Sequence, residues 1–406
     1  MAISIRNFLV ATLLWVTASA VQAQTLTLDT ALQNAFANNP ELAAAHWEIE
    51  IAEGGRQQAG LLPNPVVSWD AEDTRRDSRT TTIKLSQTLE LGGKRGARID
   101  VATRAQDAAA LTLEQRRNGL RADVLDSYYA ALRAQERLDL VQRSLRLAER
   151  GLVVANGRVS AGKSSPVEAT RAQVQLSEIR LELNRAQIGL TDAYRRLAAS
   201  TGSDAPDFQA VASQRESTPV LPPAAQLLAR LEQTAELRLA ELQVLQNEAS
   251  VGLEKAQRIP DLDVSIGSQY DASVRERVNV VGVSMPIPLF NRNQGNVLAA
   301  SRRADQARDL RNAAELRLRT ETRQALDLWQ TANTEVRAFN QQILPAAQNA
   351  VDSATRGFEM GKFSFLDVLD AQRTLIAARN QYLTATAQAT DAWVRIERIY
   401  GDLAQF

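Results

Sequence analysis

The sequence predicts a mainly α-helical protein with a small β part, in which one structural repeat occurs twice. Three observations lead to this fold class. The chain has 406 residues of which only 5% are aromatic, and this is typical of long helices rather than of a compact core rich in Phe and Trp. A motif recurs at a nearly constant distance along the chain. Finally, the hydrophobic period changes in the same order within each half.

The repeat is clearest in residues 162–173 and 361–372. Both segments begin with Gly-Lys-x-Ser and end with Ala-Gln, at an offset of about 199 residues. Gly202 and Gly401 correspond at the same offset. A constant offset over so long a stretch indicates a tandem duplication of one supersecondary unit.

We divide the chain into a signal peptide, two repeats and a linker. Residues 1–23 combine a basic start with an apolar run and with small residues before a cleavage site after Ala23. The apolar run is too short for a membrane anchor, which needs about 20 residues. The first repeat covers 24–205 and the second covers 223–406. The proline-containing stretch 206–222 between them is expected to be a linker.

Each repeat is expected to begin with short helices and to end with two long ones. The first short helices cover 28–38 and 41–58, and Pro40 separates them because proline cannot donate a helix hydrogen bond. Apolar residues from Leu138 to Val159 follow at alternating steps of three and four. This 3.5-residue period predicts a supercoiled helical hairpin.

The long helices predict an elongated molecule. The helical run over 98–158 would measure roughly 90 Å at about 1.5 Å per residue. A matching run covers 296–357 in the second repeat, where Pro345 should kink or interrupt the helix.

Between the short and long helices, each repeat contains two segments with the alternating period of β-strands. They cover 67–72 and 82–89 in the first repeat, and 262–269 and 278–289 in the second. One face of these strands is apolar and the other is polar. The polar face would carry Ser68, Asp70, Lys84, Ser265 and Gln269.

Four strands per chain are too few to close a barrel, and an open sheet leaves unpaired edges. If these strands lie in a membrane, several copies must close one barrel together, with the polar faces toward a wet lumen. The alternative is a soluble four-stranded sheet that caps a helical stalk.

The order of these elements resembles that of the TolC-like outer-membrane efflux proteins. The resemblance covers essentially the whole mature chain and includes Leu-Asp-Thr-Ala-Leu at 28–32, Asn-Pro-Glu-Leu at 39–42 and both Gly-Lys-x-Ser turns. It implies a homotrimer in which a twelve-stranded outer-membrane barrel continues into a periplasmic barrel of twelve long helices. The segments Glu-Leu-Gly-Gly-Lys-Arg at 90–95 and Pro-Ile-Pro-Leu-Phe-Asn-Arg-Asn-Gln-Gly at 286–295 look like the heavy-metal branch, which serves cobalt–zinc–cadmium or copper–silver exporters.

The turns between the long helices are the first expected functional site. Gly162 and Gly361 interrupt long helical patterns, which predicts turn conformations that favour glycine. In the family this end of the molecule meets a periplasmic adaptor protein, so the resemblance implies that both turns dock it. The plainer alternative is that the glycines form turns and the serines cap helices. The expected docking residues are Gly162, Lys163, Ser165, Gly361, Lys362 and Ser364.

Acidic residues directly after the turns are the second expected site. Asp367 and Asp370 lie three residues apart, on one helical face, and the repeat places Glu168 opposite Asp367. The resemblance implies that they line the narrow periplasmic end of the tunnel, as a gate that favours cations. The alternative is ordinary acids that stabilise a helix dipole. Arg171, equivalent to Asp370 in the repeat, is a candidate ion-pair partner for Asp370.

Composition argues against catalysis and against a dedicated metal or cofactor site. The sequence has no Cys, three Met and one His, His46, so no soft-ligand metal site and no catalytic triad is expected. We expect His46 to be an ordinary packing residue. Basic and acidic residues balance at 47 each, so no nucleic-acid partner is expected.

The leading hypothesis is a passive exit duct for heavy-metal cations, in the outer membrane of a Gram-negative bacterium and extending into the periplasm. Its expected partners are two further copies of the chain, outer-membrane lipid, a periplasmic adaptor and a proton-coupled (RND-type) inner-membrane pump. A duct for drugs or secreted proteins is the alternative within transport. A periplasmic coiled-coil scaffold without a pore is the alternative from a different class.

Overall fold

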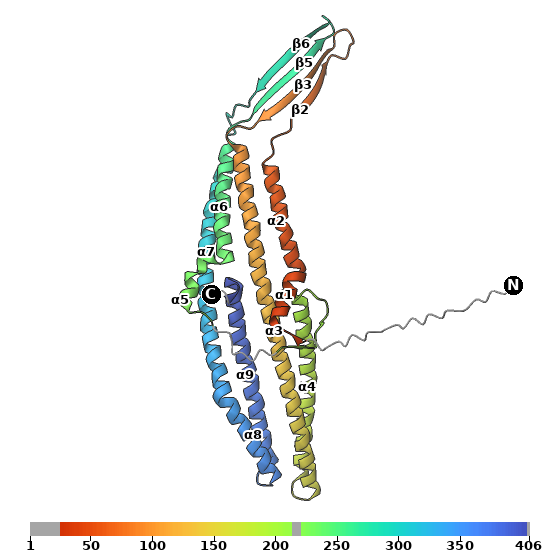
Figure 1. Ribbon diagram of the computed structural model, residues 1–406, viewed down its shortest axis with the longest axis vertical. Coiled ribbons are helices and arrows are strands. Elements are labelled where there is room, and N and C mark those ends of the chain that lie inside the picture. Colours follow the sequence, from red (N-terminus) through yellow and green to blue (C-terminus); the bar gives the residue numbers. More distant parts are fainter. Residues whose placement is uncertain (1–24, 213–220, 404–406) are drawn as a thin grey trace, which may run out of the picture.

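The computed structural model describes residues 25–212 and 221–403, so the predicted signal peptide lies outside the described residues. The described chain is an elongated rod, with a four-stranded sheet at one end and two helical hairpins at the other (Figure 1). Helices make up most of the chain. The predicted fold class, mainly helical with a small β part, is confirmed.

The elements follow the same order in both repeats, which confirms the duplication. The first repeat contains α1 (Leu28–Asn38), α2 (Pro40–Ala59), β2 (Val66–Glu72), β3 (Thr80–Leu89), α3 (Lys94–Ser160) and α4 (Pro166–Ser200). The second contains α5 (Ala224–Ala229), a 3-10 turn (Leu231–Gln233), α6 (Ala235–Ala256), β5 (Leu262–Asp271), β6 (Glu276–Ser284), α7 (Gln294–Ala338), α8 (Leu344–Glu359) and α9 (Phe365–Tyr400). The boundaries that we assigned to the repeats and the linker stay predictions.

The longest element is α3, an uninterrupted helix of 67 residues, which corresponds to roughly 100 Å. The C-terminal half of α3 packs against α4 to form the first hairpin. Val141 and Ala148 of α3 are buried there against Leu176 and Ile179 of α4. Both α3 residues belong to the run with the 3.5-residue period, so the predicted helical hairpin is confirmed.

The corresponding helix of the second repeat is broken just before Pro345, as its sequence predicts. A π-helical turn, Phe339–Ile343, separates α7 from α8. The backbone N–H of Leu344 donates to the carbonyl of Phe339, five residues back. Because proline has no N–H and its ring crowds the preceding turn, the regular pattern cannot continue through it. α8 and α9 then form the second hairpin.

The sheet is antiparallel throughout, in the order β2-β3-β5-β6. Its register places Ser68 beside Lys84, and Asp70 in one row with Thr82 and Gln269. The predicted polar residues therefore share one face. The opposite face is apolar and exposed, and its most exposed residues include Val67, Trp69, Ile266, Val281 and Val283.

The predicted last strand is too long at its C-terminal end. β6 ends at Ser284, whereas the alternation suggested a strand as far as Leu289. Pro286 and Pro288 follow, and a proline cannot donate to a strand ladder. The chain therefore leaves the sheet before the prolines and runs on to α7.

A buried tyrosine ties the start of the described chain to the segment after the first repeat. The short strand β1 (Thr25–Leu26) pairs in parallel with β4 (Ala210–Val211), which lies within the predicted linker. The side chain of Tyr128 is fully buried beside this pair. Its hydroxyl donates to the carbonyl of Ala212 at 2.9 Å and lies 3.3 Å from that of Leu26. Burial raises the pKa of Tyr128 to about 12, so the hydroxyl stays protonated at neutral pH.

We expect Tyr128→Phe to lower the free energy of unfolding by about 1–2 kcal/mol, because two carbonyls lose their shared donor. Tyr128→Ala should cost about 3–5 kcal/mol because it also leaves a cavity. Denaturation followed by circular dichroism would measure both changes. Tyr382→Phe is the matched control, since the Tyr382 hydroxyl forms no hydrogen bond within the described chain. Equal losses for Tyr128→Phe and Tyr382→Phe would contradict the assigned role.

Candidate functional site

The two hairpin turns lie at the same end of the molecule, opposite the sheet (Figure 1). We call residues 161–165 the first tip and residues 360–364 the second tip. Gly162 has φ +68° and Gly361 has φ +75°, a left-handed conformation that favours glycine. The backbone N–H of the lysine that follows closes each turn with the same kind of hydrogen bond. The N–H of Lys163 donates to the Arg158 carbonyl, and the N–H of Lys362 donates to the Gly357 carbonyl. The predicted glycine turns are therefore confirmed.

Replacing Gly361 with alanine should destabilise the second tip by about 1–2 kcal/mol, because an L-residue is strained at this positive φ. Gly157→Ala is the matched control. Gly157 lies within α3 and has no atom within 4 Å of the position that an added Cβ would take. Alanine there should therefore be neutral or stabilising by up to about 1 kcal/mol. Urea denaturation of the two purified variants would test this contrast, and equal effects would contradict it.

Both serines that follow the tips cap helices. Ser165 Oγ accepts from the N–H of Val167 at 3.3 Å, at the start of α4. Ser364 and Asp367 form a reciprocal capping box at the start of α9. In that box Asp367 Oδ2 accepts from the N–H and from the hydroxyl of Ser364, each at 2.8 Å. The Ser364 hydrogen bonds hold the pKa of Asp367 below its usual value.

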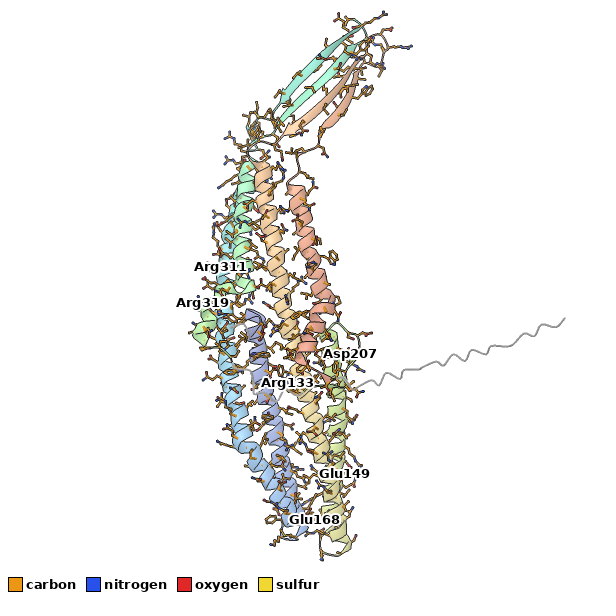
Figure 2. All side chains as sticks on the ribbon, in the orientation of Figure 1. Arg133, Glu149, Glu168, Asp207, Arg311 and Arg319 are labelled. Carbon is orange, nitrogen blue, oxygen red and sulfur yellow. The ribbon has the colours of Figure 1, made fainter. Side chains whose placement is uncertain are left out.

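The three acids of the expected gate have different surroundings. Asp367 is exposed but held by the capping box, whereas Asp370 is exposed and forms no ion pair within the described chain. Arg171 is also exposed and does not pair with Asp370 in the single chain. Glu168 lies at the lower end of α4 (Figure 2) and is half-buried, with its Oε2 buried without a hydrogen-bond partner in the described chain. Of the three carboxylates, Asp370 is therefore the one that is both exposed and without an ion pair or capping contact in the described chain.

Arg158, which sequence reasoning missed, joins the two hairpins just above the tips. Its Nη1 donates to the carbonyl of Phe358 at 3.1 Å, and its guanidinium lies 4.7 Å from the centre of the Phe358 ring. Its Nε also donates to Ser164 Oγ at 3.3 Å. Phe358 packs in turn against Phe365 of α9. No local pattern could reveal this contact, because its partners are 200 residues apart in the chain.

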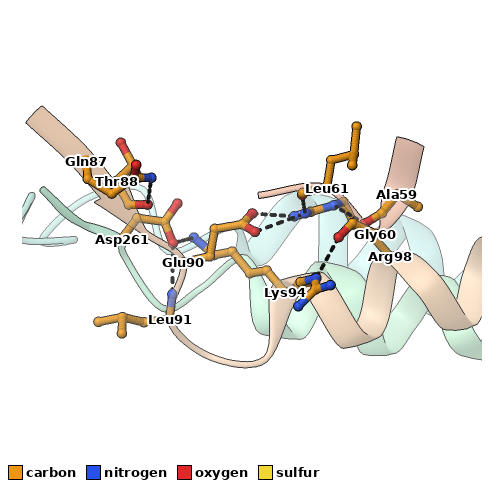
Figure 3. Close-up of polar contacts among 11 residues, drawn as sticks. Ala59, Gly60, Leu61, Gln87, Thr88, Glu90, Leu91, Lys94, Arg98 and Asp261 are labelled. Atoms are coloured by element: carbon orange, nitrogen blue, oxygen red, sulfur yellow. Dashed lines mark hydrogen bonds and ion pairs between the residues drawn. The ribbon is translucent and has the colours of Figure 1, made fainter. Parts of the chain in front are cut away.

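A second set of contacts between the repeats lies where the sheet meets the helices (Figure 3). The turn before α3 contains Gly92 and Gly93, both with positive φ. Lys94 Nζ, directly after it, donates to Asp261 Oδ1 of the second repeat at 2.7 Å.

An ion pair lies beside this turn. Arg98 Nη2 donates to Glu90 Oε2 at 2.9 Å and also to the carbonyl of Leu61. Segment 90–95, which carries the resemblance to the heavy-metal branch, therefore lies in the junction between the sheet and the helices.

The described residues contain no group of three or more His, Asp or Glu side chains placed to hold a metal ion. His46 is exposed on α2, with its ring 6.3 Å from that of Trp47. The two rings are in edge contact, and the expectation that His46 is an ordinary packing residue stays a prediction. Within residues 25–212 and 221–403, no helix combines the length and hydropathy needed to cross a membrane.

Known proteins match this chain over most of its length. It is 39% identical to the cobalt-zinc-cadmium resistance protein CzcC of Cupriavidus metallidurans, over 93% of this chain and 90% of that protein. It is 32% identical to the nickel and cobalt resistance protein CnrC of the same organism, over 68% of each.

Solved structures share the fold at lower sequence identity. The CusC structure has a TM-score of 0.77 at 20% identity and matches over 92% of each chain. The outer-membrane channel OprN also has a TM-score of 0.77 at 20% identity, over 91% of this chain and 89% of that one. A family model described as outer membrane efflux protein matches residues 31–203 and 229–402. The chain therefore belongs to the outer membrane efflux protein family.

Proposed function

We propose that this protein is the outer-membrane duct of a tripartite pump that exports heavy-metal cations. The observation that carries the proposal is the 39% identity to a cobalt-zinc-cadmium resistance protein over 93% of the chain. Relatives named for nickel, cobalt and cadmium resistance also match. Because the sequence has no Cys and a single His, soft ligands are scarce in the wall of the duct. We therefore assign the choice of metal to the inner-membrane pump and the adaptor.

The four-stranded sheet supports a duct shared by three copies. Its two edge strands, β2 and β6, each have one side without a partner in the sheet. A row of unpaired backbone groups cannot remain in lipid. If β6 of one copy pairs with β2 of the next, three copies close a twelve-stranded barrel. Its apolar face would then meet lipid, and the face with Asp70 and Lys84 would line the lumen.

We place the periplasmic adaptor at the two tips. Both lie at the end of the rod opposite the sheet, where a protein bridging to the inner membrane would arrive. The second tip and the start of α9 expose three large apolar side chains, Met360 (63%), Phe363 (47%) and Leu366 (54%). Exposed apolar groups of this size favour a protein contact. The other docking residues remain those of the sequence prediction, Gly162, Lys163, Ser165, Gly361, Lys362 and Ser364.

We place the narrowest point of the passage at Asp367 and Asp370. Three copies would bring six of these carboxylates together around one axis. Crowded negative charges attract cations and oppose anions. Because Asp370 is exposed and without an ion pair, we assign the larger electrostatic effect to it. Glu168 is half-buried and contributes less.

A deletion strain tests the substrate. Loss of the gene should lower tolerance to one or more of zinc, cobalt, cadmium, copper and silver, and a plasmid copy should restore it. Unchanged tolerance to all five metals would sink the metal proposal, and sensitivity to drugs instead would favour the alternative duct. Cell fractionation tests the architecture. A soluble periplasmic product would favour the pore-less scaffold, whereas a heat-modifiable trimer in the outer membrane supports the duct.

A further inference from the structure

The four connections between the sheet and the helices expose apolar side chains where the sheet ends (Figure 1). We call these connections, residues 60–65, 90–93, 257–261 and 285–293, the junction segments. The longest of them runs from β6 to α7 and contains Phe290, which at 90% is the most exposed large apolar residue of the described chain. The other exposed apolar residues of the junction segments are Leu61, Leu62, Leu91, Ile259, Met285, Ile287 and Leu289.

The segment from β6 to α7 continues the apolar face of the sheet. The strand ladder ends at Ser284, but exposed apolar residues go on beyond it at the same step of two. This row consists of Val281, Val283, Met285 and Ile287. The chain then turns at Pro288, where the N–H of Leu289 donates to the Ile287 carbonyl at 2.9 Å. Leu289 and Phe290 therefore lie on a tight turn at the end of the apolar row.

Two arginines are each bound to a junction segment through one nitrogen. Arg292 Nε donates to the Pro288 carbonyl at 3.2 Å, beside Phe290 in the sequence. Arg95 Nε donates to the Gly60 carbonyl at 2.7 Å, at the start of the segment from α2 to β2. Both arginines are exposed, and their Nη1 and Nη2 groups form no hydrogen bond within the described chain. These terminal nitrogens are therefore available to an external anion.

The carboxylates of this region already have partners in the chain. Three of them accept hydrogen bonds from side chains: Glu90 from Arg98, Asp261 from Lys94 and Glu254 from Asn293. Arg258, in the segment from α6 to β5, adds a third exposed arginine without an ion pair in the described chain. The exposed charge that remains in and beside the junction segments is therefore positive.

The proposed barrel gives the junction segments a definite depth. If the apolar face of the sheet meets lipid, the end of the sheet next to the helices lies at the periplasmic boundary of the hydrocarbon layer. Apolar side chains there meet acyl chains, whereas arginines extend their charged ends to the level of the headgroups. The exposed apolar residues and the arginines thus match the two layers of the inner leaflet.

We propose that the junction segments bind anionic phospholipids of the inner leaflet of the outer membrane. Ile287, Leu289 and Phe290 would enter the acyl layer, and Arg95 and Arg292 would bind a headgroup phosphate. A guanidinium suits this role because its planar donors bind phosphate through two parallel hydrogen bonds. The inference rests on the proposed function, which puts the sheet in the membrane, and it adds the class of lipid that the duct selects.

The proposed trimer would bring the two arginines together. The segments that they bind lead into β2 and out of β6, which are opposite edges of the sheet in one copy. If β6 of one copy pairs antiparallel with β2 of the next, the end of β6 lies beside the start of β2. Arg292 of one copy and Arg95 of its neighbour would then flank the same lipid at each contact between copies.

A neighbouring copy is the other occupant that these apolar groups can meet. It fits less well, because the apolar row continues the face of the sheet that would meet lipid. The neighbouring junction segment is also basic, so two copies would repel each other at this point unless an anion lies between them. An anionic lipid satisfies both the apolar surface and the charge.

The test uses the full-length protein in detergent micelles and two phospholipids, phosphatidylglycerol and phosphatidylcholine, with the same fluorescent acyl chain. Fluorescence anisotropy at low salt should show at least about tenfold tighter binding of phosphatidylglycerol, since each basic residue near an anionic lipid surface contributes roughly fivefold. The variant Arg95→Gln/Arg292→Gln should reduce this preference to about twofold or less. At about 1 M salt, where the Debye length is about 3 Å, the preference of the wild type should also fall.

Matched variants separate lipid selection from folding and from contact between copies. Arg323→Gln/Arg337→Gln changes two exposed arginines further along α7 and should keep the preference of the wild type. Ile287→Ser/Leu289→Ser/Phe290→Ser should weaken the binding of both lipids alike, because it removes only the apolar contact.

Three outcomes would overturn the inference. The first is equal binding of the two lipids by the wild type, and the second is an unchanged preference in Arg95→Gln/Arg292→Gln. The third is separation of the trimer into single copies by the serine variant, seen by size-exclusion chromatography. That result would show that a neighbouring copy, rather than lipid, covers the apolar groups.

The strain and fractionation experiments distinguish this inference from the proposed function. A soluble periplasmic product, or a deletion strain with unchanged metal tolerance, counts against the proposed function whatever the lipid titration shows. If the deletion strain is sensitive to metals and the two lipids bind equally, only the inference fails.

Discussion

Replacing Arg121 with methionine should lower the free energy of unfolding by about 3–5 kcal/mol, because it leaves a carboxylate buried without its cation. The Glu397 side chain is only 1% exposed, and Arg121 Nε donates to its Oε2 at 2.8 Å. Arg121 Nη2 also donates to Asp402 Oδ1 at 2.7 Å. One guanidinium of α3 thus holds the end of α9 and the residues that follow it. Chemical denaturation of the purified protein would measure the loss.

The pH dependence of this variant has a definite sign. Burial raises the pKa of Glu397, and Arg121 opposes that increase. An acid with a raised pKa in the folded state binds a proton more readily than in the unfolded chain, so its contribution to stability is present at low pH and is lost as the pH rises through the folded pKa. Without Arg121 the pKa should rise further. The deficit of Arg121→Met should therefore be smaller at pH 5 than at pH 7.5.

Two further variants test this mechanism. Arg121→Met/Glu397→Gln removes the buried charge and should recover part of the stability, with no difference between the two pH values. Arg238→Met is the exposed control, since its ion pair with Glu114 lies at the surface and is worth about 0–1 kcal/mol. A deficit of Arg121→Met that is the same at both pH values would contradict the buried-carboxylate mechanism.

Removing the acids of the proposed gate should change conduction more than stability. Asp367→Ala with Asp370→Ala should raise single-channel conductance at low voltage and reduce cation selectivity severalfold. The smaller alanine side chains would widen the proposed constriction, which raises conductance. The loss of charge lowers selectivity, because a carboxylate attracts a cation about 5 Å away by roughly 1 kcal/mol even in a water-like dielectric. Planar bilayer recordings with the purified protein would measure both quantities.

The single variants should separate the two acids. Asp370→Asn removes a carboxylate that has no ion pair in the described chain, so it should affect selectivity and leave stability nearly unchanged. Asp367→Asn also weakens the capping box with Ser364, at a cost of about 0.5–2 kcal/mol. Asp352→Asn, which changes an exposed acid of α8, is the control and should keep the wild-type selectivity. If the double alanine variant conducts and selects like the wild type, the gate does not lie here.

Much of this fold could be predicted because it depends on short-range patterns. The run from Leu138 to Val159 specifies a hairpin with α4, since a 3.5-residue period can only bury its stripe against another helix. Pro345 specifies the break between α7 and α8, and Gly162 and Gly361 specify turns. The largest error in a strand end, the C-terminal end of β6, shows the limit of alternation alone. The apolar pattern continues past Ser284, but the prolines that follow cannot join the ladder.

The sequence by itself determined the duplication, the helices and strands, the turns and the caps, because each follows from interactions between residues a few positions apart. Only the tertiary structure decided which side chains meet across the repeats. Arg158 with Phe358, Lys94 with Asp261 and Arg121 with Glu397 all join residues far apart in the chain. The same holds for the groove between α3, α8 and α9, which is lined by arginines from all three helices. Such contacts depend on how rigid helices pack, and helix packing is set by the whole buried surface rather than by any local pattern.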